Sequence, residues 1–190
     1  MAFIELKEII DLIVVTIALG YIFSAYIKRP KTELELVYPR FGLSWDDFKF
    51  AVIVTAPAVL LHELAHKFVA IALGLTATFK AFYAGLGIGV FLRVINSPLI
   101  ILAPGYVVIP PSTSNLAVFL TALSGPLTNL LLFFLAGYIL NNKRKLTRTQ
   151  AIALYMTKQI NLFLFIFNML PIPPLDGSKV FGSLFKLIFA

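Results

Sequence analysis

The chain has 190 residues, 59% of which are hydrophobic, and its mean hydropathy is +0.92. This apolar share is well above that of a soluble domain and places the chain in a lipid bilayer. The net charge of +7 comes from basic residues clustered at the ends of apolar runs, where they contact anionic lipid headgroups, so nucleic acid is not expected as a partner. The absence of cysteine excludes disulfides and thiolate chemistry.

The first half of the chain contains two apolar runs of membrane-spanning length, at about residues 9–27 and 50–73. A helix needs roughly 20 apolar residues to cross about 30 Å of hydrocarbon. The N-terminal sequence "MAFIELKEIIDL" carries acidic residues and no basic region before the first run, so we predict no removable signal peptide. A polar loop of mixed charge separates the two spans, and Gly74 ends the second one.

The segment 75–111 has a different composition. It is rich in Thr, Phe, Tyr, Val and Gly and is interrupted by prolines, which predicts strands and turns rather than a continuous helix. Within it, the sequence "AGLGIGVFLRV" at 84–94 combines glycines with β-formers, which also predicts strands and turns. Non-helical backbone at membrane depth must be buried in protein or face water. We therefore expect a strand-bearing loop that lines a cavity.

The second half contains two further predicted spans, at about 116–140 and 151–170, and a segment at 178–190 that is too short to cross. The predicted fold is an all-α polytopic membrane protein with a small membrane-associated β element. It has about four full spans and a short C-terminal helix, arranged as a single transmembrane domain over residues 1–190.

Both histidines of the chain lie in the second span, within the sequence "HELAH". Residues four apart share one face of a helix, so His62 and His66 present two imidazoles to one point, and Glu63 borders that face. In this HExxH arrangement two histidines bind zinc and the glutamate acts as general base on the attacking water. The alternative is a chance pair of packed histidines.

A catalytic zinc usually takes three protein ligands, and there is no third histidine. Among the acidic residues, Asp176 is the one that we place deep in apolar sequence, just after prolines that break the fourth span and before Gly177, which permits a tight turn. We therefore predict Asp176 as the third ligand. It could also cap the last short helix, which would not exclude ligation.

Three motifs in this order resemble the site-2 protease family of intramembrane zinc metalloproteases. They are "HELAH" at 62–66, "SGPLTN" at 124–129 and "NMLPIPPLDG" at 168–177. The resemblance covers about residues 51–177 and concerns the compact form without PDZ or CBS domains. It implies one Zn²⁺ per chain, held by His62, His66 and Asp176, with Glu63 as the base.

The resemblance also implies roles for residues outside the metal site. Asn168 would be catalytic through a hydrogen bond to the scissile carbonyl or its oxyanion, or would join two helices. Asn129 would hold the substrate backbone or pin the strand region, although span packing is the alternative. In such proteases the strand-bearing loop pairs with an unwound substrate, which makes Gly87 and Gly89 substrate-binding candidates.

The predicted function is therefore that of a zinc endopeptidase that hydrolyses peptide bonds in transmembrane segments of other proteins. The predicted partners are a transmembrane-helix substrate and the lipid bilayer, and the predicted location is the cell membrane. Two alternatives are a non-catalytic scaffold that binds transmembrane helices and, less favoured, a metal-ion transporter. The orientation implied by the family leaves the loops 28–49 and 141–150 outside, whereas their Lys and Arg content favours the cytosol; we follow the family.

Overall fold

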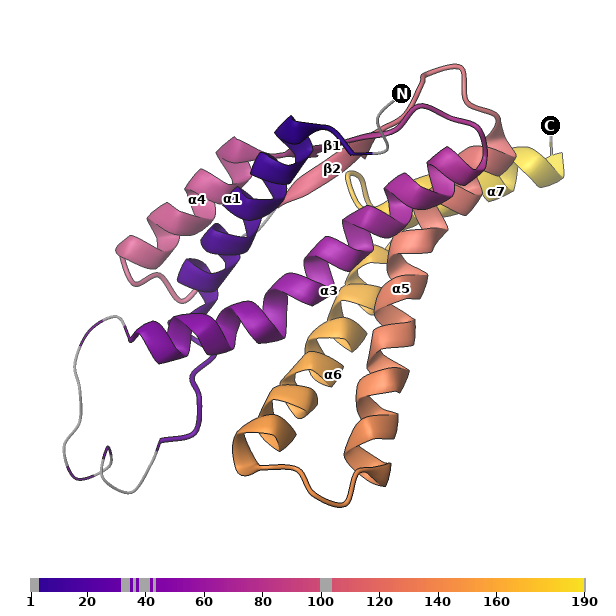
Figure 1. Ribbon diagram of the computed structural model, residues 1–190. Helices are drawn as coiled ribbons and strands as arrows, with labels where there is room; N and C mark the ends of the chain where they lie inside the picture. The colour runs from indigo at the N-terminus through magenta and orange to yellow at the C-terminus, as the bar shows by residue number, and fades with distance from the viewer. Residues whose placement is uncertain are drawn as a thin grey trace.

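The structure, a computed structural model, describes residues 4–31, 35, 37, 42, 44–99 and 104–189. In chain order its elements are α1 (Leu6–Phe23), α3 (Trp45–Ala72), β1 (Thr78–Ala81), α4 (Tyr83–Val94), β2 (Gly105–Val108), α5 (Asn115–Asn142), α6 (Arg148–Asn168) and α7 (Asp176–Phe189). Helix α3 runs through the middle of the molecule and packs against both halves (Figure 1). On one side lie α1, the strands and α4, and on the other lie α5 and α6, with α7 packed on α5.

Three of the described helices are long and apolar enough to cross a membrane: α3, α5 and α6. They correspond to the spans predicted at 50–73, 116–140 and 151–170, with ends that differ by a few residues. The span predicted at 9–27 corresponds to α1, which has only 18 residues and carries Lys7, Glu8 and Asp11. The prediction of four full spans is therefore not confirmed. The short C-terminal helix is present as α7, and it begins at Asp176, two residues before the predicted start.

Local sequence explains where the spanning helices begin. The Ser44 side chain accepts a hydrogen bond from the backbone N–H of Asp47 at the start of α3, and Ser114 caps α5 in the same way. Thr147 and Gln150 form a reciprocal capping box at the start of α6. Each cap satisfies N–H groups that have no partner within the first turn.

The β element is a two-stranded antiparallel sheet in which Phe79 lies opposite Val107 and Ala81 lies opposite Gly105. The prediction of strands within 75–111 is thus correct for two short segments and wrong for 84–94, because Tyr83–Val94 forms helix α4. The alternating glycines of this segment imitate a strand, but its buried residues are Gly85, Leu86 and Gly89. Gly89 lies four residues after Gly85 and three after Leu86, so the three share one side of a helix, and α4 packs against α1.

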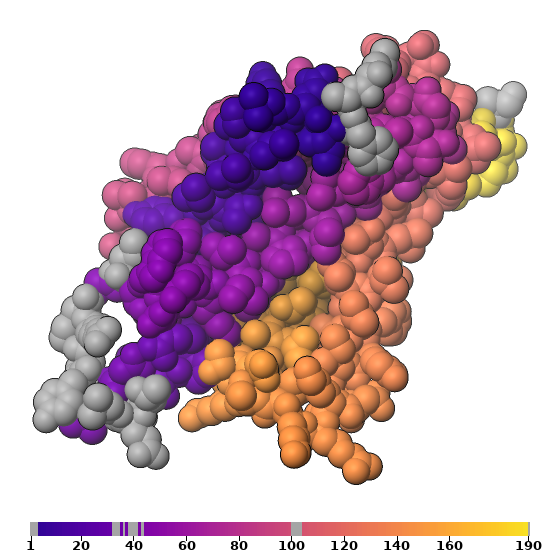
Figure 2. Space-filling model, in the orientation of Figure 1, coloured from indigo at the N-terminus to yellow at the C-terminus, as the bar shows by residue number. Residues whose placement is uncertain are grey.

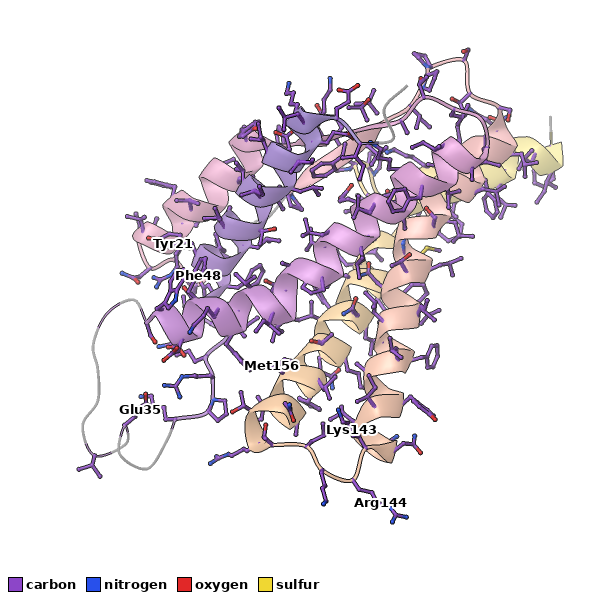
Figure 3. All side chains as sticks on the ribbon, in the orientation of Figure 1. Tyr21, Glu35, Phe48, Lys143, Arg144 and Met156 are labelled. Carbon is purple, nitrogen blue, oxygen red and sulfur yellow. The ribbon has the colours of Figure 1, made fainter. Side chains whose placement is uncertain are left out.

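Two clusters of apolar side chains hold α3 to its neighbours. One joins α1, α3 and the sheet around Leu19, Val59 and Phe79. The other lies near the start of α3, around Phe50 and Val54, where Met156 of α6 packs against it; Figure 3 labels this methionine between the two helices. Large apolar side chains also point outward, which suits a protein whose solvent is lipid.

The turn that joins α5 to α6 extends from the body of the molecule (Figure 2). It carries Lys143 and Arg144, and Arg144 points away from the helices (Figure 3). The start of α3 lies toward this same end of the molecule (Figure 1).

Candidate metal centre

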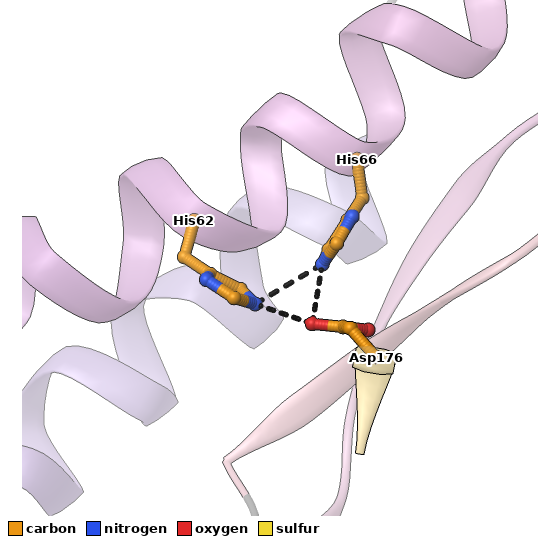
Figure 4. A group of neighbouring side chains, drawn as sticks. All are labelled: His62, His66 and Asp176. Atoms are coloured by element: carbon orange, nitrogen blue, oxygen red, sulfur yellow. Dashed lines mark hydrogen bonds and ion pairs between the residues drawn. The ribbon is translucent and has the colours of Figure 1, made fainter. Parts of the chain in front are cut away.

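Three predicted ligands from two helices converge on one point. His62 and His66 lie four residues apart on α3, and Asp176 is the first residue of α7 (Figure 4). The Nε2 atoms of the two imidazoles are 3.0 Å apart, and Oδ2 of Asp176 lies 3.0 Å from Nε2 of His62 and 3.2 Å from Nε2 of His66. All three side chains are largely shielded from solvent.

A buried amide fixes the tautomer of His62. Oδ1 of Asn129 lies 2.6 Å from Nδ1 of His62, while the Nδ2 group of Asn129 donates to the carbonyl of Ala58 and to Oδ1 of Asn161, each at 2.9 Å. Because both donors of the Asn129 amide are directed at oxygens, its own oxygen must face the imidazole. Nδ1 of His62 therefore carries the proton, and Nε2 presents a lone pair to the site.

The backbone of α5 fixes the tautomer of His66 in the same way. Nδ1 of His66 donates to the carbonyl oxygen of Thr121 at 2.7 Å, so its Nε2 also presents a lone pair. Two lone pairs 3.0 Å apart, beside a carboxylate, repel one another unless a cation lies between them. Zinc ligands at about 2.0–2.1 Å in tetrahedral geometry are separated by roughly 3.3 Å, so the observed spacing fits this metal.

Gly125 of α5 provides the space for a metal. A Cβ atom placed at this position would collide with the His66 imidazole and would lie 2.7 Å from Nε2 of His62. Any side chain here would enter the volume enclosed by the ligand atoms. The glycine of "SGPLTN" is thus required for close approach of α5 to the imidazoles rather than for backbone freedom.

The turn before α7 directs Asp176 toward α3. Gly177 is buried, and a Cβ atom there would overlap the carbonyl oxygens of Leu170 and Met169. The absence of a side chain allows α7 to start directly against the end of α6. Asp176 therefore comes within reach of the imidazoles, as predicted from the proline-rich break.

Glu63 lies beside the ligands on α3 and is 8% exposed. It directly follows His62 in the sequence. It is thus a carboxylate next to the metal position without being one of the converging ligands. This is the placement that a general base for an attacking water needs.

The remaining predicted site residues lie outside the group of three converging side chains. Asn129 is fully buried against His62, so it orients a ligand; the substrate contact predicted for it stays a prediction. Asn168 is the half-buried last residue of α6, and its catalytic role likewise stays a prediction. Gly87 and Gly89 lie on α4, so the strand that motivated their substrate role does not exist.

Sequence reasoning missed Thr121, Gly125 and Asn161 as supports of the site. A signal for Asn161 was present, because an amide within an apolar span requires a hydrogen-bond partner. Three charged residues outside the metal centre, Lys67, Glu8 and Asp11, are also buried. All three are at most 3% exposed, and Lys67 is paired with Glu8.

Two histidines and a carboxylate around one point, with a second carboxylate beside them on a membrane-length helix, define a metallopeptidase-like centre. Comparison with known proteins agrees. The sequence model of peptidase family M50 matches residues 139–190. A protein of Methanocaldococcus jannaschii named "Putative zinc metalloprotease MJ0611" is 34% identical over 180 residues, which cover 92% of this chain and 83% of that protein.

A second relative is "Putative zinc metalloprotease YwhC" of Bacillus subtilis. It is 31% identical over 152 residues, which cover 71% of this chain and 68% of that protein. The chain belongs to peptidase family M50, the site-2 protease family, and is a zinc metalloprotease. The resemblance inferred from the three sequence motifs is thereby confirmed.

Proposed function

We propose that this metalloprotease cleaves the transmembrane segments of other membrane proteins, as a multi-pass protein of the cell membrane. The observation that carries the proposal is the position of the ligands. His62 and His66 lie inside α3, a helix long and apolar enough to span the bilayer. The third ligand, Asp176, begins α7, which follows α6, another such helix, after a short turn. A substrate must therefore reach the centre within the apolar part of the protein.

In this proposal His62, His66 and Asp176 would hold the zinc, which would act as a Lewis acid and make its bound water more acidic. Glu63 accepts the proton of the attacking water at its carboxylate and delivers it to the nitrogen of the leaving amine. The Asn168 amide donates a hydrogen bond to the carbonyl oxygen of the scissile bond as negative charge develops there.

The substrate must expose a peptide bond that its own helix would shield. We propose that the unwound segment pairs with the two-stranded sheet, because α3 contacts both strands of that sheet. In this proposal the edge strand belongs to residues 78–81 or 105–108, in place of 84–94. Residues that weaken a helix in the substrate should therefore promote cleavage.

The test uses a membrane reporter with one transmembrane segment, cleaved by the purified chain in detergent or liposomes. Glu63→Gln should abolish turnover while zinc content stays at wild-type level, because the ligands are intact. His66→Ala should lose both. Turnover retained by Glu63→Gln would refute the assigned role, and a wild-type chain that binds zinc but cleaves no transmembrane reporter would refute the substrate class.

Orientation can be tested independently of catalysis. The family orientation that we adopt places the turn between α5 and α6 outside the cell. The native chain has no cysteine, so Lys143→Cys supplies a single thiol. A membrane-impermeant maleimide should label it in intact cells. Labelling only after lysis would show the opposite orientation.

A further inference from the structure

Two buried carboxylates of α1 face the sheet. Glu8 is 2% exposed and Asp11 is 1% exposed, and their spacing of three residues places them on one face of the helix. Buried carboxylates are costly unless they are paired and hydrogen-bonded. Neither carboxylate takes part in the metal centre, so the presence of both inside an apolar protein needs another explanation.

Both carboxylates accept hydrogen bonds from the backbone of β1. The N–H of Phe79 donates to Glu8 at 2.7 Å, and the N–H of Ala81 donates to Asp11 at 3.1 Å. The hydroxyl of Tyr83 also donates to Asp11. Alternate N–H groups of a strand point to the same edge, and here that edge faces away from β2. Helix α1 therefore closes the outer edge of β1.

Lys67 connects this arrangement to the helix of the metal ligands. Its ammonium donates to both carboxylate oxygens of Glu8, and it directly follows His66 on α3. Lys67 also lies four residues after Glu63, so the two share a face of α3. A continuous set of contacts thus runs from the metal helix through Glu8 to the backbone of β1.

Among the described residues, the other edge of the sheet has no hydrogen-bond partner. Residues directly opposite in an antiparallel ladder point their backbone groups either toward each other or both outward. Since Phe79 and Ala81 point outward to α1, their partners Val107 and Gly105 point outward on the far edge. Among the residues that the structure describes, no group outside the sheet donates to or accepts from that edge of β2.

We propose that Glu8, Asp11 and Lys67 are positioning residues that fix the sheet against the metal helix, so that substrate pairs with β2 and not with β1. This inference rests on the proposed cleavage of an unwound segment. A buried ion pair contributes little net stability compared with apolar residues of the same size, which favours a role in specifying one arrangement. The carboxylate acceptors determine the position of the strand, and Lys67 compensates the charge of Glu8.

The decisive experiment compares two double variants that differ at one side chain. Glu8→Gln with Lys67→Met removes both charges but keeps an oxygen that can accept from Phe79. Glu8→Leu with Lys67→Met removes the acceptor as well. Asp11→Asn and Asp11→Leu form a second such pair. Lys158→Met, which removes a lysine of α6 whose ammonium lies over the Phe133 ring, is the matched control.

Three quantities are measured on each variant: zinc content, KM against kcat for the transmembrane reporter, and hydrogen exchange of the amides of Phe79 and Ala81. We expect both leucine variants to raise KM and the exchange rate by about tenfold, as loss of one buried hydrogen bond predicts. Their kcat and zinc content should stay near wild type. The Gln and Asn variants and the control should resemble wild type throughout.

The inference is overturned if Gln and Leu at position 8 give equal exchange and equal KM, or if the Leu variants lower kcat and zinc content with KM unchanged. Should one leucine variant not fold, as judged by its zinc content, the other pair decides. If the wild-type chain cleaves no transmembrane reporter, the proposed function fails separately. The Kd for reporter binding then replaces KM, and the exchange measurement still tests the anchoring of the strand.

Discussion

Replacing Gly125 by alanine tests the metal centre with a single methyl group. The added Cβ would lie 2.7 Å from Nε2 of His62 and closer still to the His66 ring, whereas ordinary contact begins at 3.4 Å. The His62 ring would have to retreat by about 0.7 Å, yet zinc–ligand distances vary by only about 0.2 Å. The hydrogen bonds of both Nδ1 atoms oppose that retreat. We expect zinc affinity to fall by at least about 100-fold, beyond the effect of altering an outer hydrogen bond.

The assay is zinc stoichiometry and competition with a chromogenic chelator, on protein purified without a metal-binding tag. Gly137→Ala is the control, because it lies on the same helix and its Cβ would be 3.6 Å from Lys158, an ordinary contact. Both changes favour the helix by up to about 1 kcal/mol, so a general effect on α5 cancels. Wild-type zinc affinity in Gly125→Ala would show that the imidazoles do not enclose the metal as described.

Three further outcomes are expected. Asn129→Leu should weaken zinc binding about 10-fold to 100-fold, because the His62 ring loses the hydrogen bond that orients it. Asn161→Leu should cause a smaller loss, because Asn161 contacts Asn129 and not the imidazole. Competition with a chelator measures both, and equal losses would contradict this order of contacts. Removal of zinc should lower the thermal unfolding temperature, because zinc at 100 times its Kd adds about 2.7 kcal/mol to the free energy of unfolding. An unchanged unfolding temperature would show that zinc binding does not stabilise the fold. Gly177→Ala should destabilise the protein by about 1–3 kcal/mol through overlap with the carbonyls of Leu170 and Met169. Gly182→Ala, which meets open space, should be neutral or stabilising in the same thermal assay.

The convergence of His62, His66 and Asp176 could be predicted because it depends mainly on local spacing. Two histidines four apart on a helix share a face whatever the tertiary structure, and Asp176 followed from the need for a third ligand in an apolar region. The positions of the spanning helices could be predicted to within a few residues for the same reason. Their hydropathy and capping residues act over a few neighbouring positions.

The supports of the site could not be predicted from spacing, because they depend on which helices meet. Asn129 contacts a residue 67 positions away, and Thr121 contacts one 55 positions away. The same limit explains the errors at α1 and α4. In the sequence alone, Glu8 and Asp11 resemble interfacial charges, because the backbone of β1 that they bind is about 70 residues away. The glycines of α4 resemble those of a strand, because the packing of α4 against α1 is not visible in the sequence.

Packing and chemistry are hard to separate in this protein. Within a bilayer, apolar surface gives helices little reason to associate, so small residues and interhelical hydrogen bonds must hold them together. Here Gly125 and Asn129 allow α5 to approach α3, and the same two residues shape and orient the metal ligands. Zinc bound by α3 and α7 would join helices whose ligands are 110 or more positions apart. Its binding free energy would then also be free energy of helix association. A substitution of Gly125 or Asn129 should therefore change stability and metal affinity together. Glu63→Gln leaves every ligand in place and should change turnover alone.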